Sequence, residues 1–370
     1  MRPKLLHVFP TLAIGGQQTR FVTIANELGQ EFQHRLISLD GRHEAVNLLN
    51  PAIDVALLHA PTLTQNPVKA LRRIIKFLAE IDADILMTYN WGSIDWVIAN
   101  RVRFHRPHIH LEDGFGPDEA NRQKTRRVLT RRLFLQRSIV VVPSEKLQQI
   151  ALSSWRLRPE RVHYVPNGID ASRFDNIPTL GVPFFHRSNG ECIIGVFSPL
   201  RAEKNLGRLL QALGEISNSR SPSRLVICGD GAERSALMDL ATYLKLNDKV
   251  IFTGHIPRPE AVMGAFDIFA MSSDTEQMPY AVLEAMAARL PIVATDVGDI
   301  RKMVAAENRR FIVPRDDPRR LTTAIMQLCD NPTLRYRIGY ANRARVEEVF
   351  SIGSMSKALR KLLREVSPKS

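Results

Sequence analysis

Few cysteines and no long apolar run characterise this sequence, and each absence argues against a class of protein. No stretch among the 370 residues approaches the roughly 18–20 apolar residues that cross a bilayer. The N-terminal segment Met-Arg-Pro-Lys-Leu-Leu-His-Val-Phe-Pro is too short and interrupted for a signal peptide. The three cysteines, Cys192, Cys228 and Cys329, have apolar neighbours and no metal-ligand spacing, which indicates buried thiols in a reducing compartment. We therefore expect a cytoplasmic protein.

Metal-binding and nucleic-acid-reading motifs are also missing. No Asp-x-Asp pair and no His/Cys cluster stands in a suitable place for a metal, so we expect no metal ion. The net charge of +13 would attract nucleic acid, anionic lipid or phosphorylated substrates. The sequence has no recognisable nucleic-acid module and no basic surface interleaved with aromatic residues. Nucleic acid is therefore the least favoured of these partners.

Length and periodicity predict two α/β domains. The chain exceeds the roughly 250–300 residues at which a single core stops growing. Strand-like apolar runs alternate with helix-like segments throughout, so each half should be a mostly parallel sheet covered by helices. We expect one domain over residues 1–170, a linker over 171–188, a second domain over 189–352, and a basic C-terminal helix and tail over 353–370.

The stretch from 265 to 291 has the pattern of an anion-binding site. An apolar run over 265–271 predicts a buried strand, and a helix is expected from about 279 to 289, with Pro279 at its first position. The helix N-terminus favours an anion such as a phosphate. Glu276 and Glu284 flank that position. The alternative is that these glutamates are a helix cap and a solvated side chain.

Three polar loops follow predicted strands in the first half. The pair Gly15-Gly16 lies between a strand over 5–9 and a helix over 17–28, which suggests backbone packed against a phosphate. Asn90 and Trp91 follow the strand 85–88, and Glu112 and Asp113 follow the strand 108–111. Polar and aromatic side chains at the carboxyl ends of such strands are typical of ligand sites.

Two basic segments carry apolar residues at helical spacing, from Lys69 to Lys76 and from Arg122 to Arg137. Such helices either expose a solvated face or lie on anionic lipid. In the second segment we expect Arg126, Arg131 and their basic neighbours to face the lipid.

Four motifs, found in the right order, resemble those of the large and mostly retaining family 4 of GT-B glycosyltransferases. They are Tyr164-Val-Pro-Asn-Gly-Ile-Asp170, Ser198-Pro-Leu-Arg-Ala-Glu-Lys-Asn205, Gly229-Asp-Gly231, and the two glutamates Glu276 and Glu284 separated by seven residues. The resemblance covers nearly the whole chain, most strongly beyond residue 160. It implies two doubly wound, Rossmann-like α/β domains facing across a cleft, the first binding acceptor and the second donor. The C-terminal helix should pack back toward the N-terminal domain.

The resemblance also implies residue roles. Lys204 would neutralise the nucleotide diphosphate, helped by Arg201 in place of the arginine that the family usually has four or five positions before the lysine. Glu284 would accept hydrogen bonds from the ribose, and Glu276 would face the donor sugar. The remaining donor-binding residues would be Gly15, Gly16, Gly254, His255, Ile256, Gln277, Met278, Pro279, Tyr280 and Ala281.

This sequence departs from the family pattern at three places that concern substrate identity. Gln277 stands where the family commonly has glycine, the N-terminal loop reads Gly-Gly-Gln-Gln, and Glu112-Asp113 stands where a histidine is common. We assign Asp113 to the acceptor side of the catalytic site, with a turn-forming aspartate as the alternative. Asn90, Trp91 and Glu112 are assigned to acceptor binding, with a core position as the alternative for Trp91.

The resulting expectation is a retaining, metal-independent glycosyltransferase. It would move a hexosyl group from a UDP- or GDP-linked sugar, a substrate and not a cofactor, to a hydroxyl acceptor in polysaccharide or lipid-linked glycan assembly. Its partners would be the nucleotide sugar, a glycan or lipid-linked acceptor and an anionic membrane surface, at the inner face of the cytoplasmic membrane. The alternatives are a nucleotide-sugar epimerase on the same fold and, less favoured, a nucleic-acid-binding protein.

Overall fold

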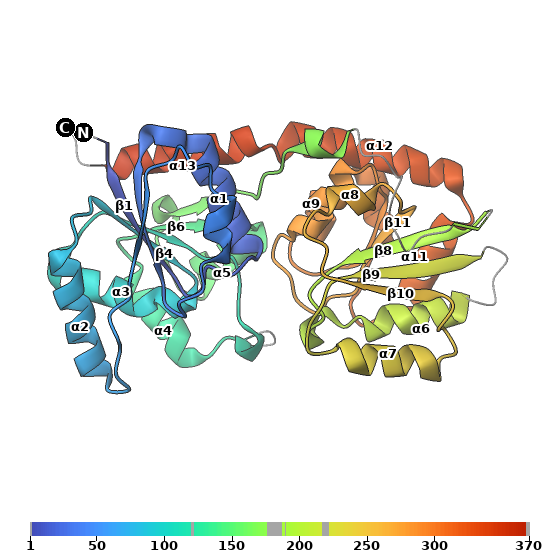
Figure 1. Ribbon diagram of the computed structural model, residues 1–370, viewed down its shortest axis with the longest axis horizontal. Coiled ribbons are helices and arrows are strands. Elements are labelled where there is room, and N and C mark those ends of the chain that lie inside the picture. Colours follow the sequence, from blue (N-terminus) through green and yellow to red (C-terminus); the bar gives the residue numbers. More distant parts are fainter. Residues whose placement is uncertain (1, 120–121, 176–186, 189, 217–221, 368–370) are drawn as a thin grey trace. The chain divides into compact units, whose positions relative to one another are not determined.

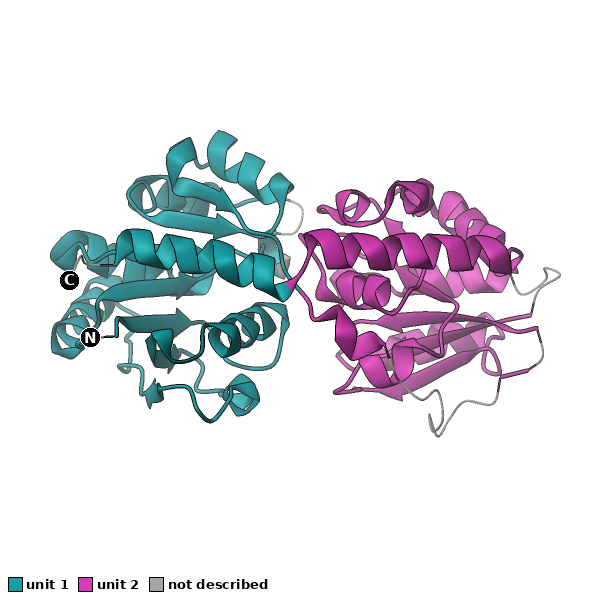
Figure 2. Ribbon diagram, turned by 90° about the horizontal axis from the view of Figure 1, so that it is seen from above, with its two compact units in different colours: residues 1–168, 352–370 teal, residues 169–351 magenta. Residues whose placement is uncertain are grey.

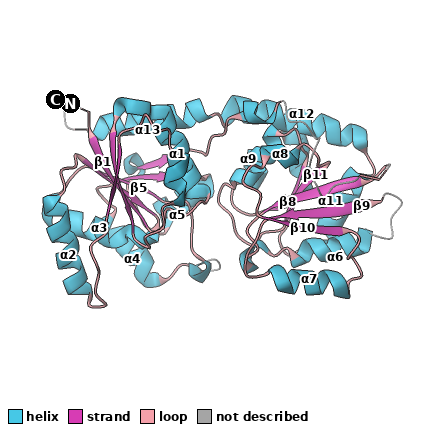
Figure 3. Ribbon diagram, viewed as in Figure 1, coloured by secondary structure: helices cyan, strands magenta, loops and turns pink. Residues whose placement is uncertain are grey.

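The computed structural model describes residues 2–119, 122–175, 187–188, 190–216 and 222–367. The chain forms two compact units, one of residues 1–168 with 352–370 and one of residues 169–351 (Figure 2). In each unit, helices cover both faces of one sheet (Figure 3). The two-sheet α/β architecture predicted from the sequence is therefore confirmed.

Unit 1 contains a seven-stranded sheet in the order β3-β2-β1-β4-β5-β6-β7, with every strand pair parallel. Its strands are β1 (Lys4–Phe9), β2 (Gln33–Ser38), β3 (Val55–Leu58), β4 (Ile85–Tyr89), β5 (His108–Leu111), β6 (Ile139–Val142) and β7 (Val162–Tyr164). Its helices are α1 (Gly16–Leu28), α2 (Pro67–Glu80), α3 (Ile94–Ala99), a π-helical turn (Asn100–Phe104), α4 (Thr125–Phe134), α5 (Glu145–Ser153) and α13 (Ile352–Val366).

Unit 2 contains a six-stranded parallel sheet in the order β10-β9-β8-β11-β12-β13. Its strands are β8 (Cys192–Phe197), β9 (Ser223–Cys228), β10 (Val250–Gly254), β11 (Ile268–Met271), β12 (Ile292–Thr295) and β13 (Ile312–Val313). Its helices are α6 (Gly207–Ile216), α7 (Arg234–Tyr243), α8 (Glu260–Met263), α9 (Tyr280–Ala287), α10 (Ile300–Met303), α11 (Pro318–Cys329) and α12 (Pro332–Val349).

The C-terminal helix α13 returns to unit 1 and packs beside α1 (Figure 1). Leu359 and Leu363 of α13 share one apolar core with Phe21 of α1 and Leu5 of β1. Burying these leucines stabilises the helix by roughly 1.5–3 kcal/mol for each side chain. The prediction that the chain's last helix packs on the N-terminal domain is confirmed.

Strand order places a switch point in each sheet, because the chain extends the sheet on one side of its first strand and then continues on the other. The switch lies between β1 and β4 in unit 1 and between β8 and β11 in unit 2. Open α/β sheets bind ligands at the carboxyl ends of the strands at such a point. A ligand is therefore expected at the loops that follow these four strands.

The predicted linker over 171–188 differs from the structure. Residues Ala171–Phe174 form a 3-10 helix of unit 2, in which Phe174 is buried in the core and Arg173 pairs with Glu260 at 2.7 Å. Residues 176–186 lie outside the described residues. The chain crosses between the units at Gly168–Ile169 and again at Ser351–Ile352. The start of the second unit was predicted too late in the sequence because residues 171–188 show no hydrophobic periodicity, so the burial of Phe174 could not be recognised from the pattern.

Two further expectations are corrected. Pro279 is the extended residue that precedes α9, at φ −71° and ψ 127°, and not the first residue within the helix. Arg131 does not face lipid, because it is fully buried in an ion pair with Glu112.

The buried thiols are as predicted, since all three cysteines are free and buried. Among the residues described, no helix combines the length and the apolar character needed to cross a bilayer.

We predict that replacing Gly195 with alanine destabilises unit 2. A Cβ built at Gly195 in β8 would overlap the ring of Phe266, so the core must shift to admit it. Such overpacking costs about 1–3 kcal/mol of unfolding free energy. Gly214→Ala in α6 is the matched control, because nothing lies within 4 Å of its Cβ and alanine favours a helix by about 0.5–1 kcal/mol. Equal denaturant midpoints for the two variants would contradict the packing assigned to β8.

Candidate functional site

An ion pair joins the loops after the two central strands of unit 2. Lys204 follows β8, Glu276 follows β11, and the Lys204 Nζ lies 2.6 Å from the Glu276 Oε1. Both side chains are mostly buried, with 14% and 10% exposed. The Ser273 hydroxyl also donates to the same oxygen at 2.7 Å. The switch point of this sheet thus brings together the cation and the carboxylate to which the family resemblance assigns donor-site roles.

Glycines allow the loop that carries Lys204 to run close to its neighbours. The Ser198 N–H donates to the Cys228 carbonyl at 3.0 Å, and the Leu200 N–H donates to the Asp230 carbonyl at 2.9 Å. Gly229 and Gly231 have φ of 150° and 156°, and a Cβ at either would overlap the backbone of Ser198 or Leu200. The glycine turn therefore sets the path of the loop that carries Lys204.

A third glycine, Gly298, lies in close contact with the backbone of the loop that carries Glu276. Gly298 has a φ of 59°, and a Cβ there would overlap the carbonyls of Glu276 and Gln277. The Asp299 N–H donates to the Gln277 carbonyl at 2.9 Å, and the Thr295 hydroxyl donates to the Ser273 carbonyl at 2.6 Å. Sequence reasoning did not single out these residues, and a glycine soon after a predicted strand was the available signal.

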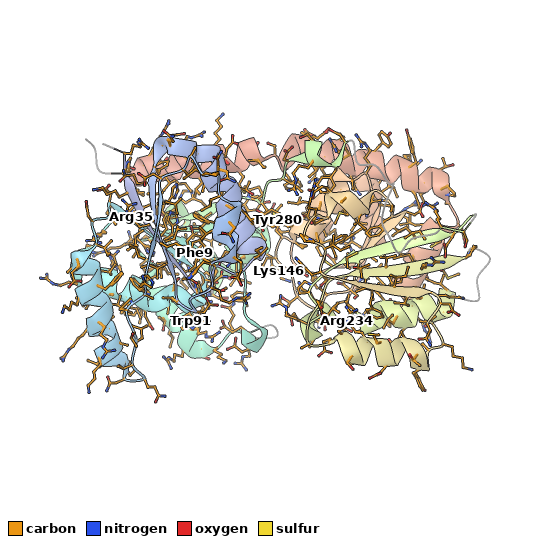
Figure 4. The ribbon with its side chains drawn as sticks, viewed as in Figure 1. Phe9, Arg35, Trp91, Lys146, Arg234 and Tyr280 are labelled. Atoms are coloured by element: carbon orange, nitrogen blue, oxygen red, sulfur yellow. The ribbon has the colours of Figure 1, made fainter. Side chains whose placement is uncertain are left out.

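Helix α9 begins directly after this loop and presents its N-terminus to the carboxyl edge of the sheet. Tyr280 and Ala281 form its first turn, and Tyr280 is labelled in Figure 4. Met278 before them is buried in the core, whereas Gln277 and Pro279 are partly exposed. The partial positive charge of a helix N-terminus adds to that of Lys204. This edge can therefore receive an anion.

Glu284 lies one turn into α9, in surroundings that disfavour its charge. Burial raises the pKa of Glu284 to about 7, the Arg173 guanidinium opposes this effect, and the Glu260 carboxylate adds to it. Glu260 is itself buried and paired with Arg173 at 2.7 Å and with Arg258 at 3.2 Å. A buried carboxyl group whose pKa is raised to near neutrality, close to the start of a helix at the carboxyl edge of a sheet, is typical of a functional site.

The predicted base-binding segment follows β10. The Gly229 N–H donates to the Gly254 carbonyl at 2.8 Å, and Gly254 has a φ of 76°. His255 is exposed, and Ile256 packs against the core of unit 2. The segment therefore joins the same carboxyl edge as the Lys204 loop.

The Arg201 carbonyl accepts a hydrogen bond from the Lys204 N–H at 3.0 Å, but the Arg201 side chain pairs with a residue other than Glu276. Its guanidinium is 55% exposed and pairs with Glu203 at 3.1 Å. It lies on the same loop, immediately before the 3-10 turn Ala202–Lys204. Its assignment to the diphosphate therefore stays a prediction.

In unit 1, Gly15 precedes α1 and Gly16 is the first residue of the helix. The same helix supplies Arg20, a residue that sequence reasoning did not identify. Its side chain is 1% exposed, and its guanidinium donates to Asp113 Oδ1 at 2.8 Å and to the Val165 carbonyl at 2.7 Å. Asp113 is therefore charge-compensated from within the unit. This pairing favours a positioning role for Asp113 over proton transfer.

Asn90 joins the ends of β4 and β5. Its Oδ1 accepts a hydrogen bond from the Asp113 N–H at 2.8 Å, and its own φ is 51°. The sheet thus brings Asn90, Glu112 and Asp113 together at one edge, as predicted from their positions after neighbouring strands. Their contacts with an acceptor remain a prediction.

Glu112 is fully buried, and its charge is held by Arg131. The Arg131 Nε donates to Glu112 Oε2 at 3.0 Å, and His110 Nε2 lies 3.5 Å from the same oxygen. Burial alone would raise the pKa of Glu112, but Arg131 and His110 hold it below the usual value. Removing one partner of such a buried pair costs roughly 3–5 kcal/mol. Glu112 therefore acts first as a structural support of this edge.

Trp91 lies beside α4 (Figure 4), and two guanidiniums contact its ring. Arg127 and Arg131 each lie 5.1 Å from the ring centroid, a distance that allows a cation–π interaction. Trp91 also packs against the apolar cluster that includes Trp155. These contacts favour the core position for Trp91 that the sequence analysis left open.

Comparison with known proteins identifies the family. A model described as "Glycosyltransferase Family 4" matches residues 14–173, and one described as "Glycosyl transferases group 1" matches residues 184–345. Together the two matches span both units, and the chain belongs to the family 4 GT-B glycosyltransferases. The predicted sugar-transfer activity is confirmed at this level.

Individual relatives are distant. The D-inositol 3-phosphate glycosyltransferase of Kineococcus radiotolerans is 27% identical over 325 residues, which cover 77% of this chain and 72% of that protein. The GDP-mannose-dependent monoacylated alpha-(1-6)-phosphatidylinositol monomannoside mannosyltransferase of Corynebacterium glutamicum is 28% identical over 214 residues, covering 54% and 55%. An Anabaena protein crystallised with UDP and glucose shares the fold at a TM-score of 0.82 and 19% identity, covering 98% of this chain and 100% of that one.

We predict that nucleoside diphosphate affinity rises with pH through the ionisation of Glu284. The family resemblance implies that Glu284 accepts hydrogen bonds from the ribose hydroxyls, and the carboxylate is a stronger acceptor than the protonated carboxyl group. With a pKa of about 7, its ionised fraction grows about tenfold between pH 6 and pH 8. Calorimetric titration with UDP or GDP at both values measures the effect. Glu284→Gln should remove most of this increase, while the ligand's own ionisation is common to both proteins.

The same raised pKa gives a stability effect of known sign. A carboxyl group whose pKa is raised by folding favours the folded state below its unfolded value of 4.5, and this stability is lost as the pH rises toward about 7. The unliganded Glu284→Gln variant should therefore gain stability relative to the wild type at pH 8 compared with pH 5. An unchanged difference between the two pH values would show that Glu284 is not held in a desolvated site.

Proposed function

We propose that the protein is a retaining glycosyltransferase that moves a hexosyl group from a nucleotide sugar to a hydroxyl acceptor. The observation that carries the proposal is the Lys204–Glu276 pair at the switch point of unit 2, beside the N-terminus of α9. Lys204 would leave Glu276 to neutralise the departing diphosphate, and Glu276 would then face the donor sugar. Catalysis would come from positioning and charge stabilisation.

A UDP- or GDP-linked sugar is the proposed donor, used as a substrate with no further cofactor. Support comes from the UDP and glucose bound in the structure of the Anabaena protein and from the GDP-mannose-dependent mannosyltransferase of Corynebacterium glutamicum. Glu284 would accept hydrogen bonds from the ribose hydroxyls. The base would lie beside Gly254, His255 and Ile256, and the diphosphate would contact the first turn of α9. Gly15, Gly16 and Arg201 are proposed to complete the diphosphate contacts, and Asn90, Glu112 and Asp113 to shape the acceptor side.

We predict that Lys204→Ala lowers kcat at least about a hundredfold, because charge on the leaving diphosphate grows in the transition state. A thermal-shift screen across UDP and GDP sugars first identifies the donor, since a ligand at 100 times its Kd stabilises by roughly 2.7 kcal/mol. Nucleoside diphosphate release in the presence of acceptor then measures kcat, and the anomeric configuration of the product tests retention.

The matched control for this lysine is Lys361→Ala, which removes an exposed lysine paired with Glu365 at 3.9 Å on α13. It should leave kcat unchanged. A kcat for Lys204→Ala within about threefold of the wild type would refute the proposed diphosphate role, and failure of every nucleotide sugar to bind would refute the proposed function.

Metal independence is a further part of the proposal. Lys204 and the α9 N-terminus already supply positive charge at the place where a cation would otherwise act. We predict that saturating EDTA leaves kcat unchanged within about twofold of the untreated enzyme. Loss of turnover on chelation that Mg²⁺ or Mn²⁺ restores would remove this part of the mechanism.

We also propose that unit 1 binds the inner face of the cytoplasmic membrane through α4 and its flanks. Leu129 and Leu133 of α4 are 49% and 67% exposed. In the described part of the chain, neither Arg126, Arg132 nor Arg137 has an ion-pair partner. Basic residues with exposed leucines fit an anionic lipid surface. At this membrane surface the enzyme would reach a lipid-linked or polysaccharide acceptor.

We predict that changing Arg126, Arg132 and Arg137 together to Glu strongly weakens binding to vesicles of anionic lipid. Each basic residue near such a surface contributes about 1 kcal/mol, so loss of three weakens binding by over about a hundredfold. Co-sedimentation with and without anionic lipid measures the effect. Arg309, Arg319 and Arg337 of unit 2, all exposed, give a control variant of equal net charge when changed to Glu. Equal binding by the two variants, or no binding by the wild type, would refute the proposal.

A further inference from the structure

We propose that Arg208 is a positioning residue for sugar transfer, holding the loops of Lys204 and Glu276 in register through Asp274 and the Ser272 backbone. This inference rests on the proposed function, because it concerns the same donor site. Arg208 is the second residue of α6, a helix that neither carries a predicted donor residue nor borders the Glu276 loop in sequence. Nothing in the motif pattern of the chain marks this arginine.

Arg208 clamps the loop that leads from β11 to Glu276. Its Nη1 donates to the Ser272 carbonyl at 2.5 Å, and its Nη2 lies 2.9 Å from Asp274 Oδ1. Only 14% of the arginine side chain is exposed. Both terminal nitrogens are therefore engaged by the loop, on the two sides of Ser273, whose hydroxyl donates to Glu276.

The same loop in turn fixes the backbone around Lys204. The Asp274 N–H donates to the Glu203 carbonyl at 2.9 Å, and the Asn205 side-chain amide donates to Asp274 Oδ2 at 3.2 Å. The Ser272 hydroxyl lies 3.2 Å from the Lys204 carbonyl and 2.9 Å from that of Asn205. Asn205 has a φ of 46°, a left-handed conformation that needs such support. The residues before, at and after Lys204 are thus all tied to the Ser272–Asp274 segment.

Helix α6 supplies a rigid base for this clamp. Leu209, Leu210 and Leu213, next to Arg208 and one turn on, are buried in the core of unit 2. A charge-assisted, two-pronged arginine contact is geometrically specific as well as strong. Misplacement of a catalytic group by about 1 Å can cost about a hundredfold in rate. Arg208 therefore acts through the two loops and has no assigned contact with substrate.

The test compares nucleoside diphosphate with nucleoside monophosphate. UMP lacks the second phosphate that Lys204 is proposed to neutralise, so the ratio of UDP affinity to UMP affinity reports the position of Lys204. GDP and GMP replace this pair if the wild type binds guanine nucleotides. Calorimetry on Arg208→Met should show that this ratio falls by at least about tenfold while UMP affinity stays within about twofold. Asp274→Asn should reduce the ratio in the same direction.

Two further variants separate positioning from a general loss of structure. Arg345→Met is the matched control, because Arg345 of α12 also donates to two acceptors, the backbone carbonyls of Met303 and Lys302, which belong to α10 and to neither loop. It should leave the ratio unchanged. Arg208→Lys keeps the charge but can reach only one of the two partners, so its ratio should lie between those of the wild type and Arg208→Met.

Three results would overturn the inference. The first is an unchanged ratio in Arg208→Met, and the second is an equal loss of UDP and UMP affinity, which indicates general unfolding of the site. The third is a ratio in Arg208→Lys as low as in Arg208→Met with wild-type thermal stability. A wild type that binds both nucleotides equally would instead refute the diphosphate role of Lys204, and the inference would fall with it.

Discussion

The ion pair between Lys204 and Glu276 is the contact on which the donor site of this protein depends. It exists because β8 and β11 are neighbours at the centre of a parallel sheet, so that the loops following them begin at the same edge. Close backbone approach at Gly229 and Gly231 sets the path of the first loop, and close approach at Gly298 sets the path of the second. Hydrogen bonds from Asp274 and Ser272 to the backbone around Lys204 then join the two loops. Without a ligand, the cation and the carboxylate neutralise each other, which lowers the cost of holding two charges in a mostly buried position. An incoming diphosphate would take over the lysine.

Unit 1 uses the same device with other residues. Arg20 holds Asp113, and Arg131 holds Glu112, so that both acidic residues after β5 are compensated by buried arginines from neighbouring helices. Buried arginines of this kind fix loop geometry at the cost of desolvation, and loss of either partner would leave an uncompensated charge. These two ion pairs therefore hold the loop after β5, which is proposed to shape the acceptor side, in a fixed position.

Much of the fold followed from the sequence, because buried parallel strands read as continuous apolar runs such as Ile139–Val142, and because Gly and Pro mark the ends of elements. Glu276 could be found for the same reason, since it stands a few residues after such a run, whereas Lys204 was identified through the resemblance of its motif to that of the family. Arg131 was misjudged because its neighbours in the sequence are basic, whereas its partner Glu112 comes from β5, and helical periodicity alone cannot show a buried ion pair. Arg20 and Arg208 were missed because their partners lie more than 60 residues away, in loops whose path only the tertiary structure defines.

The most direct test of this account is a crystal structure of the protein with the nucleoside diphosphate that it binds, solved beside the unliganded form. The account predicts that the Lys204 Nζ lies about 2.7–2.9 Å from a diphosphate oxygen and no longer within hydrogen-bond distance of Glu276 Oε1, from which it lies 2.6 Å without ligand. It also predicts that the clamp between Arg208 and Asp274 is unchanged. A diphosphate bound away from Lys204, with the pair to Glu276 intact, would contradict the proposed donor site.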